Sequence, residues 1–182
     1  MTKLRRWIVR LLMGLMVAIP LAAVSLYAAN PFGVRSYDPR QRILGYSPYR
    51  VPSRSMMPTV DPGRIVIMRA GYYSGHQPER GDIVIFLNPE DGNIWIERVV
   101  GLPRETIAIQ EGIVVVDGRK LVEDYLAAEN VTTDYSQSMS ARKVPENSYF
   151  LLGDNRDNSE DARIFGGTPR EDLTGKVVAI LK

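Results

Sequence analysis

The fold is decided by residues 94–122, IWIERVVGLPRETIAIQEGIVVVDGRKLV, in which short β-branched runs alternate with turn residues. The apolar runs lie at 94–100, 106–109 and 113–116. Strands of this length, separated by turn signals, predict an all-β sandwich or barrel. Asp117-Gly118 stands between the third run and residues 119–122. This dipeptide is a strong signal for a two-residue hairpin turn.

Similar runs occur on both sides of this stretch, at 64–69, 82–87, 148–152 and 176–181. The sequence therefore predicts a mainly β body built from seven such strands.

Two segments lack the pattern. Residues 30–49 carry three prolines and predict an irregular connector, apolar enough near Ile43 to Tyr46 to lie along a membrane surface. Residues 123–147 are polar and predict an irregular excursion or a flexible loop.

The composition of the 182-residue chain excludes several kinds of site. The length fits one domain, or a domain with an appendage. The chain has no cysteine, which excludes a disulfide framework, a thiolate zinc site and a cysteine nucleophile. The first ten residues hold four cations and no acid, so the rest of the chain is slightly acidic. Such a body lacks the basic face of a nucleic-acid-binding domain.

The N-terminal segment is predicted to be a membrane anchor. Residues 11–29 carry no charge, and about 20 apolar residues suffice for a helix to cross a bilayer. The basic flank predicts a cytoplasmic tip at 1–10, a transmembrane anchor at 11–29 and an extracytoplasmic domain at 30–182. A cleaved secretory signal is the alternative, with Ala23-Val24-Ser25 as a cleavage site. The long apolar run and the interfacial Tyr27 favour the retained anchor.

Residues 51–60, VPSRSMMPTV, form a stiff loop that carries two serines, Ser53 and Ser55. Pro52 and Pro58 fix their own φ angles and push the preceding residues toward extended conformations. Serine-containing proline turns are usually only turns. A catalytic role for this loop therefore depends on other segments of the chain.

Three further segments belong to the same argument: 80–86 (RGDIVIF), 96–103 (IERVVGLP) and 153–163 (GDNRDNSEDAR). The last holds three Asp, two Asn and two Arg in eleven residues, but lacks the ligand spacing and terminal Glu of an EF-hand. We therefore favour a network of carboxylates, amides and guanidinium groups that fixes a loop beside a site. An exported β domain that binds a polar ligand through this loop is the alternative.

With the apolar N-terminal segment and these four segments in this order, the chain resembles the bacterial type I signal peptidases, also called leader peptidases. The resemblance implies a transmembrane helix followed by an antiparallel β domain whose apolar face lies against the membrane. It implies a single-pass protein of the bacterial cytoplasmic (inner) membrane, with its C-terminal domain on the periplasmic or extracellular side. Its partners would be the lipid bilayer and the signal peptides of exported preproteins, with small residues at −1 and −3. It implies no metal, no cofactor and no nucleic acid.

The resemblance also assigns roles to single residues. The serine of the Ser-Met-x-Pro motif, Ser55, would be the nucleophile. Ser53 would donate its hydroxyl to the oxyanion hole, together with the backbone N–H of Ser55. Ser159 would orient the general base, and Asp161 with Arg163 would form a supporting ion pair. The other charged residues expected to support the site are Asp154 and Arg156.

The sequence departs from the family pattern at Glu97, because the resemblance implies a general-base lysine immediately before Arg98. A buried lysine has a lowered pKa and can accept the serine proton, whereas burial raises the pKa of a glutamate. An ionised Glu97 would also resist the negative charge that develops on the substrate oxygen. A protonated Glu97 has no useful basic lone pair.

Three hypotheses therefore stay open. Glu97 acts as a poor base, another residue takes the role, or the protein is a catalytically inactive binding or assembly subunit of a membrane complex. Lys120 and Lys143 are the nearby lysines, but nothing in the sequence puts either amine beside Ser55. His76 lies in a glycine-rich turn and is expected to be an exposed loop residue.

Overall fold

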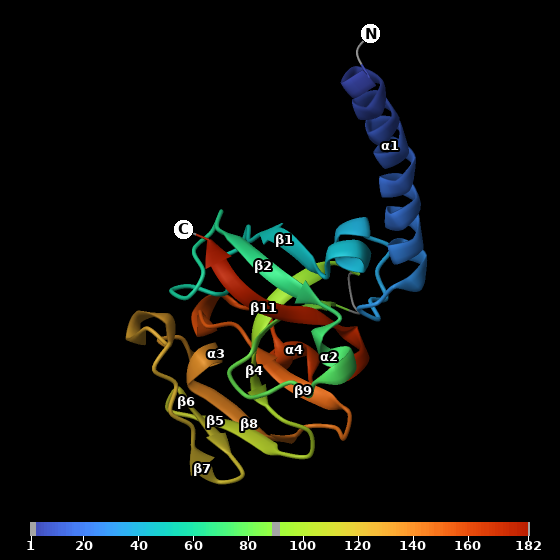
Figure 1. Cartoon of the computed structure of the whole chain (residues 1–182). Helices are drawn as coiled ribbons and strands as arrows, with labels where there is room; N and C mark the ends of the chain where they lie inside the picture. Colours follow the sequence, from blue (N-terminus) through green and yellow to red (C-terminus); the bar gives the residue numbers. More distant parts are fainter. Residues whose placement is uncertain (1–2, 89–91, 182) are drawn as a thin grey trace.

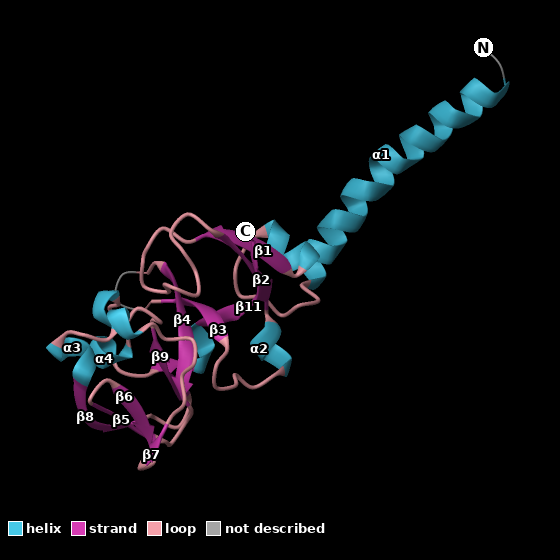
Figure 2. Ribbon diagram, turned by 90° about the vertical axis from the view of Figure 1, so that its left-hand side faces the viewer, coloured by secondary structure: helices cyan, strands magenta, loops and turns pink. Residues whose placement is uncertain are grey.

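The computed structural model describes residues 3–88 and 92–181. Its first element is α1 (Lys3–Ala29), which runs away from the β body (Figures 1 and 2) and buries none of its residues. The helix is long and apolar enough to cross a membrane. It includes most of the basic tip as well as the span expected at 11–29. Its role as a retained anchor stays a prediction.

The larger sheet has seven strands in the order β1-β2-β11-β3-β4-β9-β10, and neighbouring strands are antiparallel. β11 comes last in the sequence but lies between β2 and β3, so it ties the early strands to the late ones. The bounds are β1 (Tyr46–Arg50), β2 (Ile65–Ala70), β3 (Ile83–Leu87), β4 (Ile94–Gly101), β9 (Ser148–Leu152), β10 (Thr168–Pro169) and β11 (Leu173–Leu181).

The smaller sheet lies at the end of the body away from α1 (Figure 1). Its strand order is β7-β6-β5-β8, with β5 (Thr106–Gln110), β6 (Ile113–Val116), β7 (Arg119–Lys120) and β8 (Ser138–Lys143). β6 and β7 are joined by Asp117 and Gly118, whose φ angles are 47° and 79°. Two positive φ angles are the mark of a type I′ hairpin turn, so the hairpin prediction is confirmed.

Short helical turns connect the strands. Before β1 lies η1 (Arg40–Leu44), and between β2 and β3 lies α2 (Tyr72–Gly75). The turns near the small sheet are η2 (Ala128–Asn130) and α3 (Asp134–Gln137). Those after β9 are η3 (Arg156–Asn158), α4 (Ala162–Phe165) and η4 (Arg170–Asp172). The polar segment 153–163 thus contains η3 and the start of α4, with non-helical residues before and between them.

The predicted mainly β, antiparallel fold class is confirmed, and all seven predicted runs form strands. The expectation for residues 30–49 was wrong at its end, because β1 occupies Tyr46–Arg50 and pairs with β2. β1 has no β-branched residue and contains Pro48, so its sequence gives no strand signal. Proline is tolerated there because β1 is an edge strand.

The expectation of an irregular or flexible segment at 123–147 was wrong for Ser138–Lys143, because β8 pairs with β5 there. Only Met139 of β8 is buried, and its other side chains face solvent. An edge strand of this kind has polar side chains, and its partner strand rather than its own pattern fixes its conformation. The small sheet therefore combines the apolar hairpin β5–β6 with the mostly polar strand β8.

Candidate active site

The serine loop 51–60 connects β1 to β2 and is held at both ends. Met56 and Val60 are fully buried in an apolar cluster with residues of β2 and β3. The backbone N–H of Val60 donates to the carbonyl of Met56 at 2.8 Å, which closes the turn. On the other side, the Ser55 carbonyl accepts the N–H of Asn155 at 2.8 Å. The loop is therefore fixed both to the core and to the polar segment 153–163.

Ser53 and Ser55 present their hydroxyls side by side. The two Oγ atoms lie 3.0 Å apart, within hydrogen-bond distance. Both residues line a cavity of about 260 Å³. The rest of its lining is Pro52, Ile94, Trp95, Ile96, Glu97, Asn158 and Glu160. The structure thus brings together Ser53, Ser55 and Glu97, three residues expected at the site, from segments more than 40 positions apart in sequence.

Glu97 reaches the cavity from β4, where it lies opposite Val84 of β3. Its side chain is almost entirely buried, with the residue 2% exposed. Burial raises the pKa of the Glu97 carboxyl well above its usual value, and the negative charge of Asp161 raises it further. The positive charge of Arg163 opposes both effects but does not cancel them. The protonated form of Glu97 is therefore favoured more than in an exposed glutamate.

The carboxyl of Glu97 makes no hydrogen bond or ion pair with residues 3–88 and 92–181, the part of the chain that the structure describes. Its charge is offset only at longer range, by Arg163. An ionised carboxylate in such a place is costly, because no direct partner among the described residues compensates for the hydration that burial removes.

Ser159 is buried close to the nucleophile loop. Its Oγ atom finds no hydrogen-bond partner among the described residues. Gly153 lies against it, since a Cβ on Gly153 would come within 2.3 Å of Ser159 Oγ and 2.7 Å of the Ser55 carbonyl oxygen. Ser159 does not itself line the cavity, whereas its neighbours Asn158 and Glu160 do. The absence of a side chain at Gly153 is what allows Ser159 and Ser55 to pack so closely.

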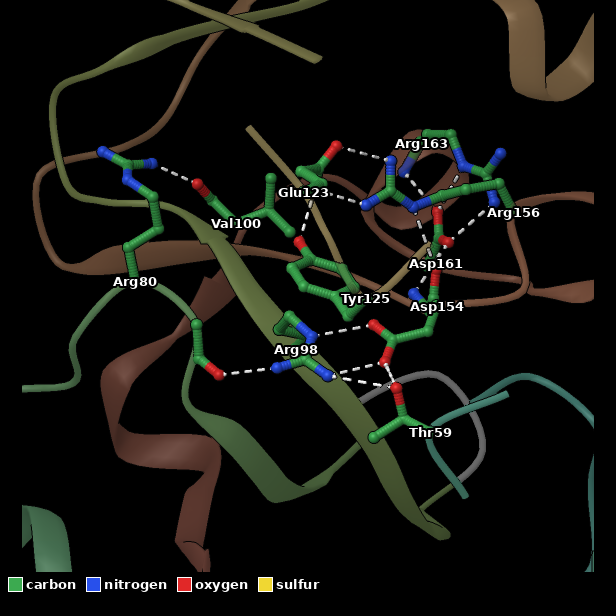
Figure 3. A network of polar contacts seen from close by, with 12 residues as sticks. Thr59, Arg80, Arg98, Val100, Glu123, Tyr125, Asp154, Arg156, Asp161 and Arg163 are labelled. Carbon is green, nitrogen blue, oxygen red and sulfur yellow. Dashed lines mark hydrogen bonds and ion pairs between the residues drawn. The ribbon is translucent and has the colours of Figure 1, made fainter. Parts of the chain in front are cut away.

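Asp161 and Arg163 form a buried ion pair at 2.8 Å (Figure 3). Asp161 also accepts the backbone N–H groups of Gly153, at 3.2 Å, and Arg163, at 3.1 Å. The guanidinium of Arg163 lies over the ring of Tyr135, 4.0 Å from its centroid. The pair therefore closes the loop on itself and attaches it to α3.

Asp154 joins the same loop to β4. It accepts two hydrogen bonds from Arg98, from Nε at 2.8 Å and from Nη2 at 2.6 Å. The hydroxyl of Thr59 donates to the same carboxylate. Arg98 in turn lies over the ring of Tyr125, 3.9 Å from its centroid. One buried carboxylate thus links the serine loop, β4 and the segment 153–163 (Figure 3).

Arg156 makes the third buried ion pair, with Glu123 at 2.6 Å. Its Nε donates to the carbonyl of Gly153 at 3.0 Å, and Tyr125 donates its hydroxyl to Glu123. The sequence analysis missed Glu123 and Tyr125, because no local pattern marks them, and it gave no role to Thr59, which lies within the loop 51–60. Arg98 lies in the segment 96–103, but the sequence analysis assigned it no role.

The alternative bases lie away from the serines. Lys120 on β7 and Lys143 on β8 are exposed on the small sheet, and Lys176 pairs with Asp82 at 2.6 Å. None of the lysines between residues 3 and 181 lines the cavity. His76 is exposed and stacks on Tyr72, as expected for a loop residue. Glu97 is thus the titratable side chain that the fold brings to the cavity from the predicted general-base position.

The three aspartates of the polar loop are paired within the protein, whereas its one glutamate, Glu160, is exposed. Asp154 and Asp161 pair with arginines, as described above, and Asp157 accepts hydrogen bonds from the backbone and hydroxyl groups of Thr132 and Thr133. These contacts agree with a network that fixes the loop. They leave these three aspartates little capacity for an external polar ligand, the alternative raised from the sequence.

The chain is similar to a protein-family model, to several known proteins and to a solved structure. A family model described as "Signal peptidase, peptidase S26" matches residues 4–182. The chain is 33% identical over 163 residues to the signal peptidase I of Leptolyngbya laminosa, covering 85% of this chain and 74% of that protein. It is 35% identical over 137 residues to the probable signal peptidase I-1 of a Synechocystis strain, covering 70% and 67%. A crystal structure of a signal peptidase I from Enterococcus faecalis matches with a TM-score of 0.51 and 35% identity, over 57% of this chain and 98% of that one.

Proposed function

Because this chain belongs to the signal peptidase family, peptidase S26, we propose that it is a membrane-anchored serine endopeptidase that removes signal peptides from exported preproteins. The apolar helix α1 would anchor it in the bacterial cytoplasmic membrane, with the β body on the outer side. The proposal needs no metal and no cofactor, since its chemistry comes from serine hydroxyls and one proton acceptor.

The observation that carries this proposal is the pair of hydroxyls, Ser53 Oγ and Ser55 Oγ, which lie 3.0 Å apart on residues that line one cavity. Ser55 attacks the carbonyl carbon of the scissile peptide bond. Ser53, so close to the attacking oxygen, donates its hydroxyl to the oxyanion that forms, together with backbone N–H groups. The rigid anchoring of the loop through Met56 keeps this geometry in the free protein.

The proton of Ser55 has to leave during the attack, and Glu97 is the carboxyl of the cavity lining that stands at the general-base position implied by the family resemblance. It accepts a proton only in its ionised form. Burial and Asp161 raise its pKa, so the ionised fraction at neutral pH is smaller than for an exposed glutamate. The raised pKa makes the ionised carboxylate a better proton acceptor, but less of that form is present at neutral pH.

Five further residues act by positioning. Asp154, Arg156, Asp161 and Arg163 hold the segment 153–163 in place through buried ion pairs. Ser159, whose hydroxyl has no hydrogen-bond partner among the described residues, would orient the base. None of these five lines the cavity, so we assign them no direct contact with the scissile bond.

The proposal is tested with the full chain in lipid or detergent and a preprotein that carries a signal peptide. Mass spectrometry of the products should find a single cut after the signal peptide. Ser55→Ala should abolish it, while Ser138→Ala, a serine exposed on β8, should leave it unchanged. Cleavage that persists in Ser55→Ala would show that the mechanism is wrong.

A second candidate function is a binding or assembly subunit that holds signal peptides without cutting them. The buried, protonation-prone Glu97 favours it, because a neutral carboxylic acid has no basic lone pair to offer. Glu97→Lys distinguishes the two candidates. A large gain of cleavage on introducing lysine would favour the binding subunit, whereas activity in both proteins without a gain would point to another base.

A further inference from the structure

The segment 121–137, which connects β7 to β8, contacts the proposed active site although it lies outside the four motifs. Asn130 donates to the carbonyl of Met57, two positions after the nucleophile, at 3.1 Å. Tyr135 donates its hydroxyl to the carbonyl of Ser159, also at 3.1 Å. We propose that Tyr135 is a positioning residue of this site, which acts through Ser159 on the proton-transfer step. The inference rests on the proposed function, since it adds a residue to the same site.

The first argument is the position of the Tyr135 phenol. The carbonyl oxygen of Ser159 accepts from the Tyr135 hydroxyl and from Nη2 of Arg163, the latter at 3.3 Å. The guanidinium of Arg163 also lies over the Tyr135 ring, and its Nη1 donates to the Tyr135 carbonyl at 3.4 Å. Two donors that contact each other therefore hold one oxygen of the Ser159 main chain.

The second argument is that the Ser159 hydroxyl depends on its main chain for its direction. The Oγ atom has no hydrogen-bond partner among the described residues, so no such bond orients it in the free protein. The residue is buried and packs directly against Gly153, which leaves it little room to move. The allowed directions of a side chain follow from its backbone through a small set of rotamers. A hydrogen bond that fixes the Ser159 carbonyl therefore also restricts where the hydroxyl points.

The third argument is that the phenol lies within electrostatic range of the general-base position. Burial and the negative charge of Asp161 raise the pKa of Tyr135 to about 12, against the opposing charge of Arg163. The negative charges of Glu97 and Glu160 raise this pKa further. The hydroxyl is therefore protonated, and able to donate, across the neutral pH range.

The experiment compares the wild type with Tyr135→Phe, using the full chain in lipid and a preprotein that carries a signal peptide. Phenylalanine keeps the ring that Arg163 covers and removes only the hydroxyl. We expect kcat to fall about fivefold, the effect typical of one lost hydrogen bond. KM should stay unchanged, because Tyr135 does not line the cavity. The control is Tyr37→Phe, which removes the hydroxyl of an exposed tyrosine before β1 and should change neither constant.

A double-mutant cycle tests whether Tyr135 acts through Ser159. Ser159→Ala alone should lower kcat, because it removes the hydroxyl that orients the base. Adding Tyr135→Phe to Ser159→Ala should then cause no further loss. A residue that only stabilised the fold would instead lower kcat by the same factor in both backgrounds.

Four outcomes overturn the inference. These are an unchanged kcat in Tyr135→Phe, a raised KM in place of a lowered kcat, an unchanged kcat in Ser159→Ala, and equal losses in both backgrounds of the cycle. The proposed function is judged separately, by Ser55-dependent cleavage in the wild type. If the wild type does not cleave, the proposed function fails and this inference fails with it. If the wild type cleaves and Tyr135→Phe behaves like Tyr37→Phe, only this inference fails.

Discussion

Asp154 and Arg98 are 56 positions apart in sequence, yet the guanidinium donates two hydrogen bonds, at 2.8 and 2.6 Å, to one fully buried carboxylate. This pair joins β4, which carries Glu97, to the segment that follows β9. Because Thr59 donates to the same carboxylate, the serine loop is fixed by it as well. The relative positions of Ser55 and Glu97 depend on this contact.

Asp154→Ala should therefore destabilise the protein strongly. It leaves the Arg98 guanidinium buried without its partner, which typically costs about 3–5 kcal/mol of unfolding free energy. Denaturant unfolding followed by circular dichroism measures the change. The matched control is Glu146→Ala, which removes the carboxylate of a largely exposed pair with Arg104 and should change stability little. Similar losses in both variants would contradict the assigned importance of the Asp154 pair.

Gly153→Ala should displace the nucleophile loop. The new Cβ would meet Ser159 Oγ and the Ser55 carbonyl oxygen at 2.3 and 2.7 Å, well inside contact distance. Overpacking of this kind costs about 1–3 kcal/mol of stability, and a misplaced nucleophile lowers kcat/KM by about 100-fold. Gly75→Ala is the control, because no atom lies within 4 Å of its added Cβ. Wild-type kcat/KM in Gly153→Ala would refute the close packing.

The folded protein should lose stability as the pH rises through the range in which Glu97 ionises. Burial, and then the charge of Asp161, raise the pKa of Glu97 above its unfolded value, against the opposing charge of Arg163. The folded state therefore binds more protons than the unfolded state above about pH 4.5, and the free energy of unfolding falls with rising pH. The stabilisation that protonated Glu97 contributes is fully present below the pKa of Glu97 in the unfolded state. It is lost as the pH rises above the pKa of Glu97 in the folded state.

Glu97→Gln isolates this effect, because the amide imitates the neutral acid at every pH. Its unfolding free energy minus that of the wild type should grow as the pH rises from 4 to 8. The other charged groups that interact with the site, Asp161, Arg163 and Glu160, are present in both proteins. Two parallel stability curves would contradict a raised pKa at Glu97.

If Glu97 is the proton acceptor, the pH profile of kcat/KM for signal-peptide cleavage should have a rising limb above pH 4.5. The limb follows ionisation of a carboxyl whose pKa is raised by burial and by Asp161. Rates measured from pH 4 to 9 with wild type and Glu97→Gln test this. The variant should lose the limb and most of the activity. An unchanged profile in Glu97→Gln would identify another base.

Helix α1 should remain attached to the mature protein. A tag placed before Met1 distinguishes the anchor from a cleaved signal, because cleavage after Ala23-Val24-Ser25 would release it. We expect the protein in purified membranes to have the mass of the full tagged chain. Protease added to the outer face should digest the β body and spare the tag, as the basic flank predicts. Loss of the tag from the body would favour the cleaved signal.

Much of the fold could be predicted from the sequence, because strand periodicity and hairpin chemistry are local. The Asp117-Gly118 turn and the seven apolar runs needed no information from distant residues. Edge strands β1 and β8 escaped prediction for the opposite reason. Their conformation comes from hydrogen bonds to β2 and β5, so Pro48 and the polar residues of β8 carry no strand signal of their own.

For the site, the sequence by itself determined which residue types stand in the four motifs, including the serines of the stiff loop and the glutamate at position 97. Only the tertiary structure decided that Ser53, Ser55 and Glu97 share one cavity, that Glu97 is buried there with no direct partner among the residues the structure describes, and that its neighbouring arginines are already paired. The physical reason is that a carboxyl's pKa depends on burial and nearby charges. Those neighbours come from strands and loops far apart in the chain.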